Sequence, residues 1–222
     1  MPTELHLALQ GLYAGDDGVI EAAVGSYRAD VLRGGVCYEI QTGSFGAIRR
    51  KLEKLLQHQR VVLVYPVAQQ KLIVQIDGEG REVSARRSPK RGRMVDVFAH
   101  LMHLRGLLAH PKLQLEVVLT VERELRRKDG MGSWRRGGVS LVGRELIEVV
   151  EVQRFKRPAD LKRLLPKELP REFTTADLRE TLSLRGGLAG KMAYALRELA
   201  VIEQVGKRGN ALVYRTRGRR TN

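Results

Sequence analysis

The spacing of apolar and polar residues predicts a mixed α/β fold at the start of the chain. Residues 3–13 place three leucines on one face of a helix, and Thr3 can cap its first turn. Three strand-like stretches follow at 19–26, 28–32 and 36–41. The segment Arg33-Gly34-Gly35 predicts a hairpin between the last two. The pattern therefore predicts a helix followed by a three-stranded meander.

The pattern then alternates between helix and strand. Over residues 45–56 the apolar positions recur at helical spacing and Arg or Lys fills most of the others, which predicts an amphipathic helix packed on the sheet. The apolar run 61–66 predicts a buried strand. The remaining segments predict strands at 71–76 and 113–123, a helix over 95–108, and an extended or mixed segment over 139–153. The fold class expected is α/β (α+β).

Three prolines within Lys156–Pro170 interrupt any long helix or strand and predict a domain boundary. We expect a first domain at 1–155, a linker or first helix of the next domain at 156–172, and a second domain at 173–222. Residues 156–222 carry 16 Lys or Arg against 7 Asp or Glu, so the smaller part has the denser positive charge.

The second domain has a sharper pattern. Thr174 with Asp177 three residues later is a capping-box arrangement at the start of a helix. A glycine turn, a second amphipathic helix over 188–199 and a hairpin with the basic turn Gly206–Asn210 follow. Helix, turn, helix and hairpin in this order resemble a winged helix-turn-helix domain, with residues 160–169 as its first helix.

By this resemblance the second helix presents Lys191, Tyr194 and Arg197 to the major groove of DNA. Lys207 and Arg208 on the wing would contact phosphate or the minor groove. The alternative interpretation is a protein-interaction module whose charges only solvate its surface.

Charge favours nucleic acid as the partner. The 40 Lys and Arg against 25 Asp and Glu leave a formal charge of +15, which attracts polyanions whatever the fold. No apolar run is long enough to span a membrane, and the start lacks the pattern of a signal peptide, so we expect a cytoplasmic protein. The sole cysteine, Cys37, lies in an apolar stretch and is expected to be a buried hydrophobic residue.

Asp30 and Glu39 carry the candidate chemistry. Alternation in the third strand places Glu39 and Gln41 on one face and turns Ile40 into the core. If the hairpin brings Asp30 beside Glu39, the two carboxylates require a cation, and hard oxygen ligands suit Mg²⁺ or Mn²⁺. The alternative is that both acids are exposed polar residues on a half-solvated sheet.

These residues in this order resemble the PD-(D/E)xK restriction-endonuclease-like nucleases, which include Holliday junction resolvases. The resemblance covers residues 2–66 and implies a mixed sheet flanked by helices. It also implies metal binding by Asp30, Glu39 and the carbonyl of Ile40. The supplementary acid would be Glu4, with Glu21 as the alternative.

Two positions depart from the family pattern. Ala29 stands where the family name has proline, and Gln41 stands where the family usually has its lysine. Glutamine cannot supply the positive charge of that lysine. The resemblance leaves two alternatives: some members of the family work with glutamine at this position, or the side chain of Lys51 or Lys54 on the next helix reaches the site instead.

Two further basic segments, 81–93 and 123–136, are expected to be loops that follow a phosphate backbone. The second contains Arg126, Arg127, Trp134 and Arg135, and Trp134 could stack on an unpaired base. The alternative for Trp134 is a loop anchor packed on the core. A Gly-rich phosphate loop, a Gly-x-Ser-x-Gly elbow and paired cysteines are all missing from the sequence, so it gives no support for ATPase, serine-hydrolase or thiol chemistry.

The sequence thus predicts a Mg²⁺-dependent DNA endonuclease whose winged helix grips or selects the DNA. The second hypothesis is a non-catalytic DNA-binding regulator with a degenerate nuclease-like domain. An RNA substrate is less favoured. A homodimer is a further possibility, because cutting both strands of DNA requires two active sites.

Overall fold

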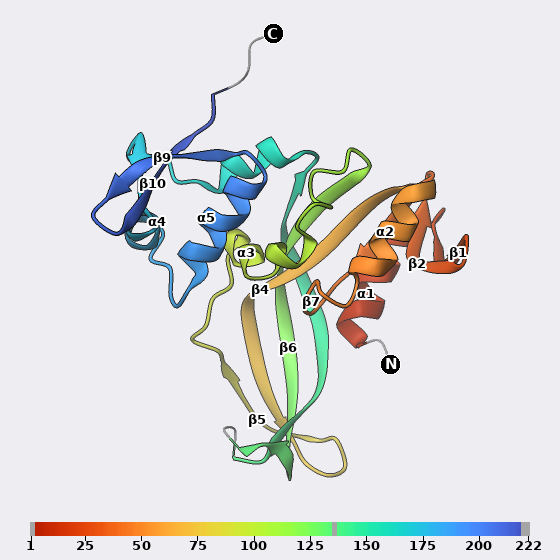
Figure 1. Ribbon diagram of the computed structural model, residues 1–222. Coiled ribbons are helices and arrows are strands. Elements are labelled where there is room, and N and C mark those ends of the chain that lie inside the picture. The colour runs from red at the N-terminus through yellow and green to blue at the C-terminus, as the bar shows by residue number, and fades with distance from the viewer. Residues whose placement is uncertain (1–2, 135–136, 219–222) are drawn as a thin grey trace.

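A computed structural model describes residues 3–134 and 137–218 (Figure 1). Its main feature is a seven-stranded mixed sheet in the order β1-β2-β3-β4-β6-β7, with β5 paired to β4. Helices cover both faces of this sheet, and a three-stranded sheet belongs to the C-terminal part. The expected α/β class is therefore confirmed.

The N-terminal elements agree with the sequence pattern. Helix α1 (Glu4–Ala14) begins after Thr3, whose hydroxyl accepts a hydrogen bond from the backbone of His6. The antiparallel meander that follows consists of β1 (Val19–Val24), β2 (Tyr27–Arg33) and β3 (Val36–Ile40). Helix α2 (Arg49–His58) then leads into β4 (Arg60–Ile76), which is parallel to β3.

The two faces of the sheet have separate cores because successive side chains of a strand point to opposite faces. Leu5 and Leu9 of α1 pack on one face with Ile40 and Val64. The other face is covered by α2 and by a larger core that continues into the C-terminal part as far as Tyr214. The sheet therefore holds α1 and α2 on opposite sides of β3.

The largest difference from expectation lies in the long strands. Segments 61–66 and 71–76 are one strand, β4. The strand predicted over 113–123 lies in β6 (Leu113–Ser133), but the predicted loops at 81–93 and 123–136 contain β5 (Glu82–Arg87) and the rest of β6. Strand β7 (Val139–Phe155) pairs with β6 along its length. The prediction of loops was wrong because many positions that would be apolar in an ordinary strand are charged here and form ion pairs between strands, such as Lys71 with Glu124.

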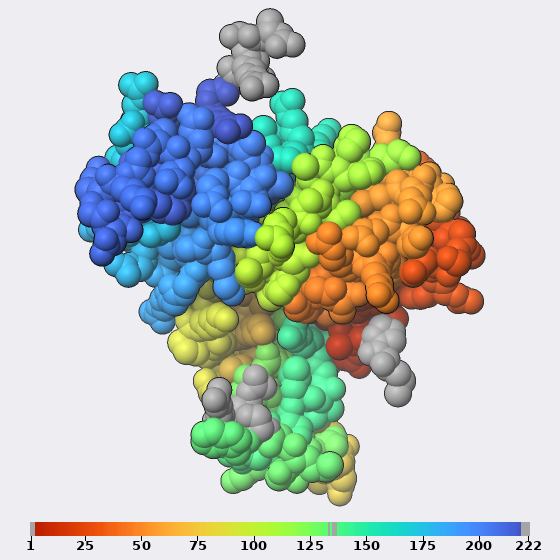
Figure 2. Space-filling model, viewed as in Figure 1, coloured from red at the N-terminus to blue at the C-terminus, as the bar shows by residue number. Residues whose placement is uncertain are grey.

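The outer parts of β4, β5, β6 and β7 form an arm that projects from the body (Figure 1). Strand β3 ends at Ile40, opposite Val64 of β4, whereas β4 continues from Tyr65 to Ile76, paired with β6 and, near its end, with β5. The space-filling view shows the arm clear of the remaining surface (Figure 2).

The predicted helix over 95–108 is broken into three short pieces. These are η1 (Met94–Val97), α3 (Phe98–Leu101) and η2 (Met102–Leu104). The segment after η2 turns at Gly106, whose φ of +82° is unfavourable for residues with a side chain. The apolar positions still face the core, which is why the sequence pattern resembled one helix.

The C-terminal part contains two helices and a small sheet. After the 3-10 helix η4 (Pro158–Leu164), its elements are β8 (Glu172–Phe173), α4 (Thr175–Thr181), α5 (Leu188–Glu198), β9 (Ile202–Arg208) and β10 (Ala211–Thr216). The capping box is confirmed, since Asp177 accepts a hydrogen bond of 2.7 Å from the backbone of Thr174. The first helix expected over 160–169 is instead the short η4, because Pro166 prevents its extension.

The C-terminal part is fastened to the first part by polar contacts as well as by the shared core. Arg105 donates a hydrogen bond of 2.8 Å to the hydroxyl of Tyr194 on α5. Arg93 donates one of 2.5 Å to the carbonyl of Leu182, beyond α4. The two parts are therefore in direct contact.

Two expectations drawn from composition can be compared with the structure. Cys37 is buried as predicted, and burial raises the pKa of its thiol to about 11. Among the described residues, no helix has both the length and the apolar character needed to cross a membrane.

Gly92 provides a test of the junction between the arm and the body. Its N–H donates to the carbonyl of Ala68, and a Cβ at this position would lie 2.5 Å from the same oxygen. We expect Gly92→Ala to lower the free energy of unfolding by about 1–3 kcal/mol in denaturant titrations. The matched control is Gly78→Ala, where a Cβ meets no atom within 4 Å. Equal stability of the two variants would contradict this packing.

Candidate nuclease site

Asp30 and Glu39 lie side by side where β2 and β3 separate. The last backbone pair of the two strands is Val31 with Tyr38, which places Asp30 opposite Glu39. The backbone of Asp30 donates to Oε1 of Glu39 at 3.2 Å, and the backbone of Ile40 donates to Oδ2 of Asp30 at 2.7 Å. At this point the side-chain carboxylates of Glu39 and Asp30 accept the backbone hydrogen bonds that main-chain carbonyls would accept if β2 and β3 stayed paired.

Both acids are buried. Glu39 has no exposed surface, and Asp30 is 9% exposed. The alternative interpretation of exposed residues on a half-solvated sheet is therefore wrong. Ile40 is buried under α1, as alternation predicted.

Glu21 extends this arrangement to a third strand. Its neighbours Ile20 and Ala22 pair with Val31 and Ala29, so Glu21 lies opposite Asp30. Glu21 has a φ of +53°, a conformation that costs free energy for any residue with a side chain. Glu21, Asp30 and Glu39 therefore form a row of carboxylates across three adjacent strands.

Lys51 of α2 supplies a positive charge to this row. Its Nζ lies 2.6 Å from Oε2 of Glu39 and 3.3 Å from Oδ1 of Asp30. Gln41, at the position of the family lysine, donates instead to the carbonyl of Ser44 at 2.7 Å. Lys54 is exposed. Of the two lysines considered from the sequence, Lys51 is the one that reaches the acids.

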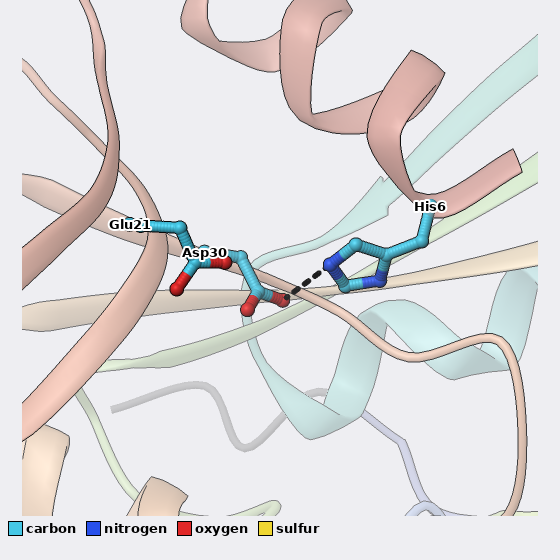
Figure 3. A group of neighbouring side chains, drawn as sticks. All are labelled: His6, Glu21 and Asp30. Atoms are coloured by element: carbon cyan, nitrogen blue, oxygen red, sulfur yellow. Dashed lines mark ion pairs between the residues drawn. The ribbon is translucent and has the colours of Figure 1, made fainter. Parts of the chain in front are cut away.

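Two residues of α1 that sequence reasoning missed complete the site. Nε2 of His6 lies 3.8 Å from Oδ2 of Asp30, and Figure 3 shows the imidazole directed at that carboxylate. Gln10, one helical turn later, donates to Oε1 of Glu21 at 2.9 Å and to the carbonyl of Asp30 at 3.3 Å. Their spacing of four residues beside Leu5 and Leu9 was the available signal, since it places both on the sheet-facing side of the helix.

His6, Glu21 and Asp30 form a group that could hold a metal ion. One ligand atom from each lies within 4.8 Å of the others. Glu4 does not belong to this group; it is exposed, and its carboxylate lies beside Gly143 of β7. Of the two candidates for a supplementary acid, Glu21 is therefore the one beside Asp30.

The electrostatics of the row centre on Glu39 and Lys51. Burial and the neighbouring Asp30 raise the pKa of Glu39 to about 7, although Lys51 opposes the shift. Burial disfavours the charged form of Lys51, but Glu39 and Asp30 outweigh it and hold the pKa of Lys51 above its usual value. Lys51 thus forms ion pairs with two of the three carboxylates of the row.

The basic residues singled out in the first part have different surroundings. Arg126 is paired with Glu124 at 2.5 Å, and Arg127 donates to the carbonyl of Asp77 at 3.1 Å. Trp134 is 84% exposed, so the alternative of a loop anchor packed on the core is wrong. Arg135 lies outside the described residues.

The predicted DNA-contacting residues of the C-terminal part fall into two groups, exposed residues and residues that contact other side chains. Lys191, Lys207 and Arg208 are exposed. The hydroxyl of Tyr194 is bonded to Arg105, and the guanidinium of Arg197 lies 5.7 Å from the centroid of the Tyr194 ring. Contact of Tyr194 with a nucleic acid would thus compete with its contact to the first part.

Comparisons with known proteins give a family but no activity. A family described as "Domain of unknown function (DUF8091)" matches residues 3–156, ending one residue after β7. An uncharacterized protein of Treponema pallidum (strain Nichols) is 30% identical over 217 residues, covering 96% of this chain and 84% of the relative. No solved structure gives a significant match.

The raised pKa of Glu39 predicts a dependence of stability on pH. Between its ordinary value of 4.5 and about 7, the folded chain keeps a proton that the unfolded chain has lost. The free energy of unfolding therefore decreases as pH rises through this window. Glu39→Gln removes the titration, so we expect the Tm of the variant minus that of wild type to increase with pH.

Thermal unfolding of chelator-treated protein from about pH 4.5 to 8 measures this difference. Glu53→Gln on the same helix as Lys51 is the control, since Glu53 is only half-buried and pairs with Arg49. A Tm difference for Glu39→Gln that does not change with pH would show that Glu39 ionises normally.

Proposed function

We propose that this chain, which belongs to the family described as "Domain of unknown function (DUF8091)", is a metal-dependent DNA endonuclease. The observation that carries the proposal is the row of Glu21, Asp30 and Glu39 on adjacent strands with Lys51 between two of its acids. Buried acids next to a lysine are costly for folding, so their presence at one end of a strand indicates a functional site.

The order of elements supports the same proposal. A helix, a three-stranded antiparallel meander, a second helix and a parallel strand follow one another, as in the PD-(D/E)xK nucleases. The acids lie on the second and third strands of the meander, where that family has its motif. Lys51 supplies at these acids a positive charge that Gln41 cannot, which supports the likeness to that family.

The donor atoms fit a divalent metal. By the family likeness, Asp30, Glu39 and the carbonyl of Ile40 would hold Mg²⁺ or Mn²⁺, with Glu21 as supplementary acid. The ligand atoms that lie closest together belong to His6, Glu21 and Asp30, so His6 would join the set. Carboxylates suit both ions, while an adjacent imidazole favours Mn²⁺ over Mg²⁺. Bound there, the metal would polarise a phosphodiester and lower the pKa of an attacking water.

The chain's own residues contribute positioning and charge. Lys51 holds an ammonium at the acids, where it can orient a water molecule and offset negative charge that develops on the phosphate. Gln10 holds the side chain of Glu21 and the backbone of Asp30 in place from α1. The row is therefore fixed from both sides of the sheet.

The C-terminal part would serve as a winged helix that grips DNA. Its order of α4, α5 and the β9–β10 hairpin supports this assignment, together with the exposed Lys207 and Arg208 at the hairpin. Lys191 on α5 is available for a backbone or base contact. The basic charge of this part supplies affinity that does not depend on sequence.

Substitution of Asp30 tests the nuclease. With Mg²⁺ or Mn²⁺ present, we expect Asp30→Asn to reduce the cleavage rate of labelled DNA by roughly 100-fold or more. Without metal, the variant should bind DNA as tightly as wild type or more tightly, because a carboxylate beside phosphate is repulsive.

Asp17→Asn is the matched control, because Asp17 pairs with Arg33 at the surface. Duplex DNA, single-stranded DNA and RNA are compared as substrates. Tight DNA binding by wild type without cleavage of any substrate would favour a non-catalytic regulator. Cleavage of RNA alone would move the proposal to a ribonuclease.

Lys51 is tested separately. We expect Lys51→Ala to reduce cleavage by roughly 100-fold. Lys54→Ala, which removes an exposed lysine from the same helix, should leave the rate within about 3-fold of wild type, since single exposed charges contribute little. If circular dichroism shows that both variants are folded, equal cleavage rates for the two would contradict a role of Lys51 in cleavage.

A further inference from the structure

The projecting arm is too long to be explained by the site at its base. Beyond the end of β3, β4 runs from Tyr65 to Ile76, which spans about 40 Å at roughly 3.3 Å per residue. The arm leaves the sheet at the end where Asp30 and Glu39 lie. It is therefore placed to follow a molecule that occupies the site.

Ion pairs fix the strands of the arm to one another. Arg123 bonds to both Glu82 of β5 and Glu145 of β7, and Glu124 receives Lys71 and Arg126. These contacts join β4, β5, β6 and β7 across the arm. They indicate a stiff ribbon, and they account for many of its charges.

A second set of cations on the arm does not take part in the ion pairs between its strands. Arg86 and Arg87 at the end of β5, and Lys90 and Arg91 after it, are exposed. Within the part of the chain that the structure describes, none of these four forms an ion pair with an acid. An exposed run of four cations beside a rigid ribbon is complementary to a phosphate backbone.

The tip of the arm presents two large apolar side chains to solvent. Met131 is 88% exposed and Trp134 is 84% exposed, near the end of β6. The turn is fixed by Asp129, whose Oδ1 accepts from the backbone of Met131 at 3.0 Å and from the hydroxyl of Ser140 at 2.7 Å. Exposed Lys128 precedes it. The exposed Met131 and Trp134 therefore lie on an ordered turn at the end of the ribbon, with the positive charge of Lys128 nearby.

We infer that the arm is a DNA-binding ribbon and that Met131 and Trp134 insert into the base stack. Apolar wedges between base steps bend duplex DNA, and an aromatic ring stacks on an unpaired base. The cations at 86–91 then contact the phosphates of the same duplex. The tip favours duplexes whose stack is already weakened, such as one with a bulged base. The inference takes DNA as partner from the proposed function but does not depend on cleavage.

Intrinsic fluorescence gives a direct reading of the tip, because Trp134 is the sole tryptophan of the chain. The full-length Asp30→Asn protein is titrated, without divalent metal, with intact duplex and with the same duplex carrying two unpaired adenines. We expect quenching of tryptophan emission by both, at lower DNA concentration for the bulged duplex.

Anisotropy of labelled DNA then measures affinity in variants of the same protein. Replacing both Met131 and Trp134 with serine should weaken binding of the bulged duplex by about 10-fold or more, because the variant loses the stacking of an aromatic ring on a base. Intact duplex should lose less. Val83→Ser is the matched control, since Val83 is 66% exposed on β5, a strand of the same arm that carries neither Met131 nor Trp134.

The possible results distinguish a failure of this inference about the arm from a failure of the proposed nuclease activity. DNA binding with unchanged tryptophan emission and no effect of the serine variant would overturn the inference alone. A change in emission as the protein is concentrated without DNA would instead identify the tip as a contact between copies of the chain, and would also overturn it. Tip-dependent binding without cleavage by wild type would overturn only the nuclease.

Discussion

The carboxylates of Asp30 and Glu39 face each other in a part of the sheet that water hardly reaches, and their repulsion constrains everything around them. Lys51 offsets it from α2, and the backbone N–H groups of Asp30 and Ile40 bind the acids from the strands. Glu21 brings a third acid to the row. Side chains from helices on both faces of the sheet, Lys51 of α2 and Gln10 of α1, therefore contact this row.

This constraint connects the site to the arm. Strand β3 stops at the row of acids, while its neighbour β4 and the adjacent β6 continue far beyond it. A substrate at the acids would therefore lie against the base of the arm. In the arm the sheet has little apolar cover, and ion pairs such as those of Arg123 and Glu124 take over the cohesion between strands. Charge thus stabilises the ribbon along its length and, by our inference, binds DNA at its edge.

The sequence predicted local features well and long-range ones poorly. The first helix, the meander, α2, the buried strand of β4 and the capping box of Thr174 followed from periodicity and turn residues. The positions of Asp30 and Glu39 followed from alternation and a hairpin. The arm did not, because alternating charged residues look like a loop until their cross-strand partners are known.

The other site residues could not be assigned from the sequence because their distance from the acids depends on tertiary packing. His6 and Gln10 lie more than ten residues from the acids they approach, and only packing of α1 on the sheet brings them there. Glu21 was one of two candidates for the supplementary acid, and the strand register places it, and not Glu4, opposite Asp30. Lys51 was named as a substitute for Gln41, but its reach depended on the orientation of α2, which periodicity does not give.

A crystal structure of the protein soaked with Mn²⁺, with anomalous diffraction, tests the central claim most directly. The account predicts an anomalous peak at coordination distance from the carboxylate of Asp30, with Lys51 moved away from at least one acid. A site in which Lys51 still joins Asp30 to Glu39 at saturating Mn²⁺, without a peak, would show that the lysine is the permanent counter-ion and that the row is structural.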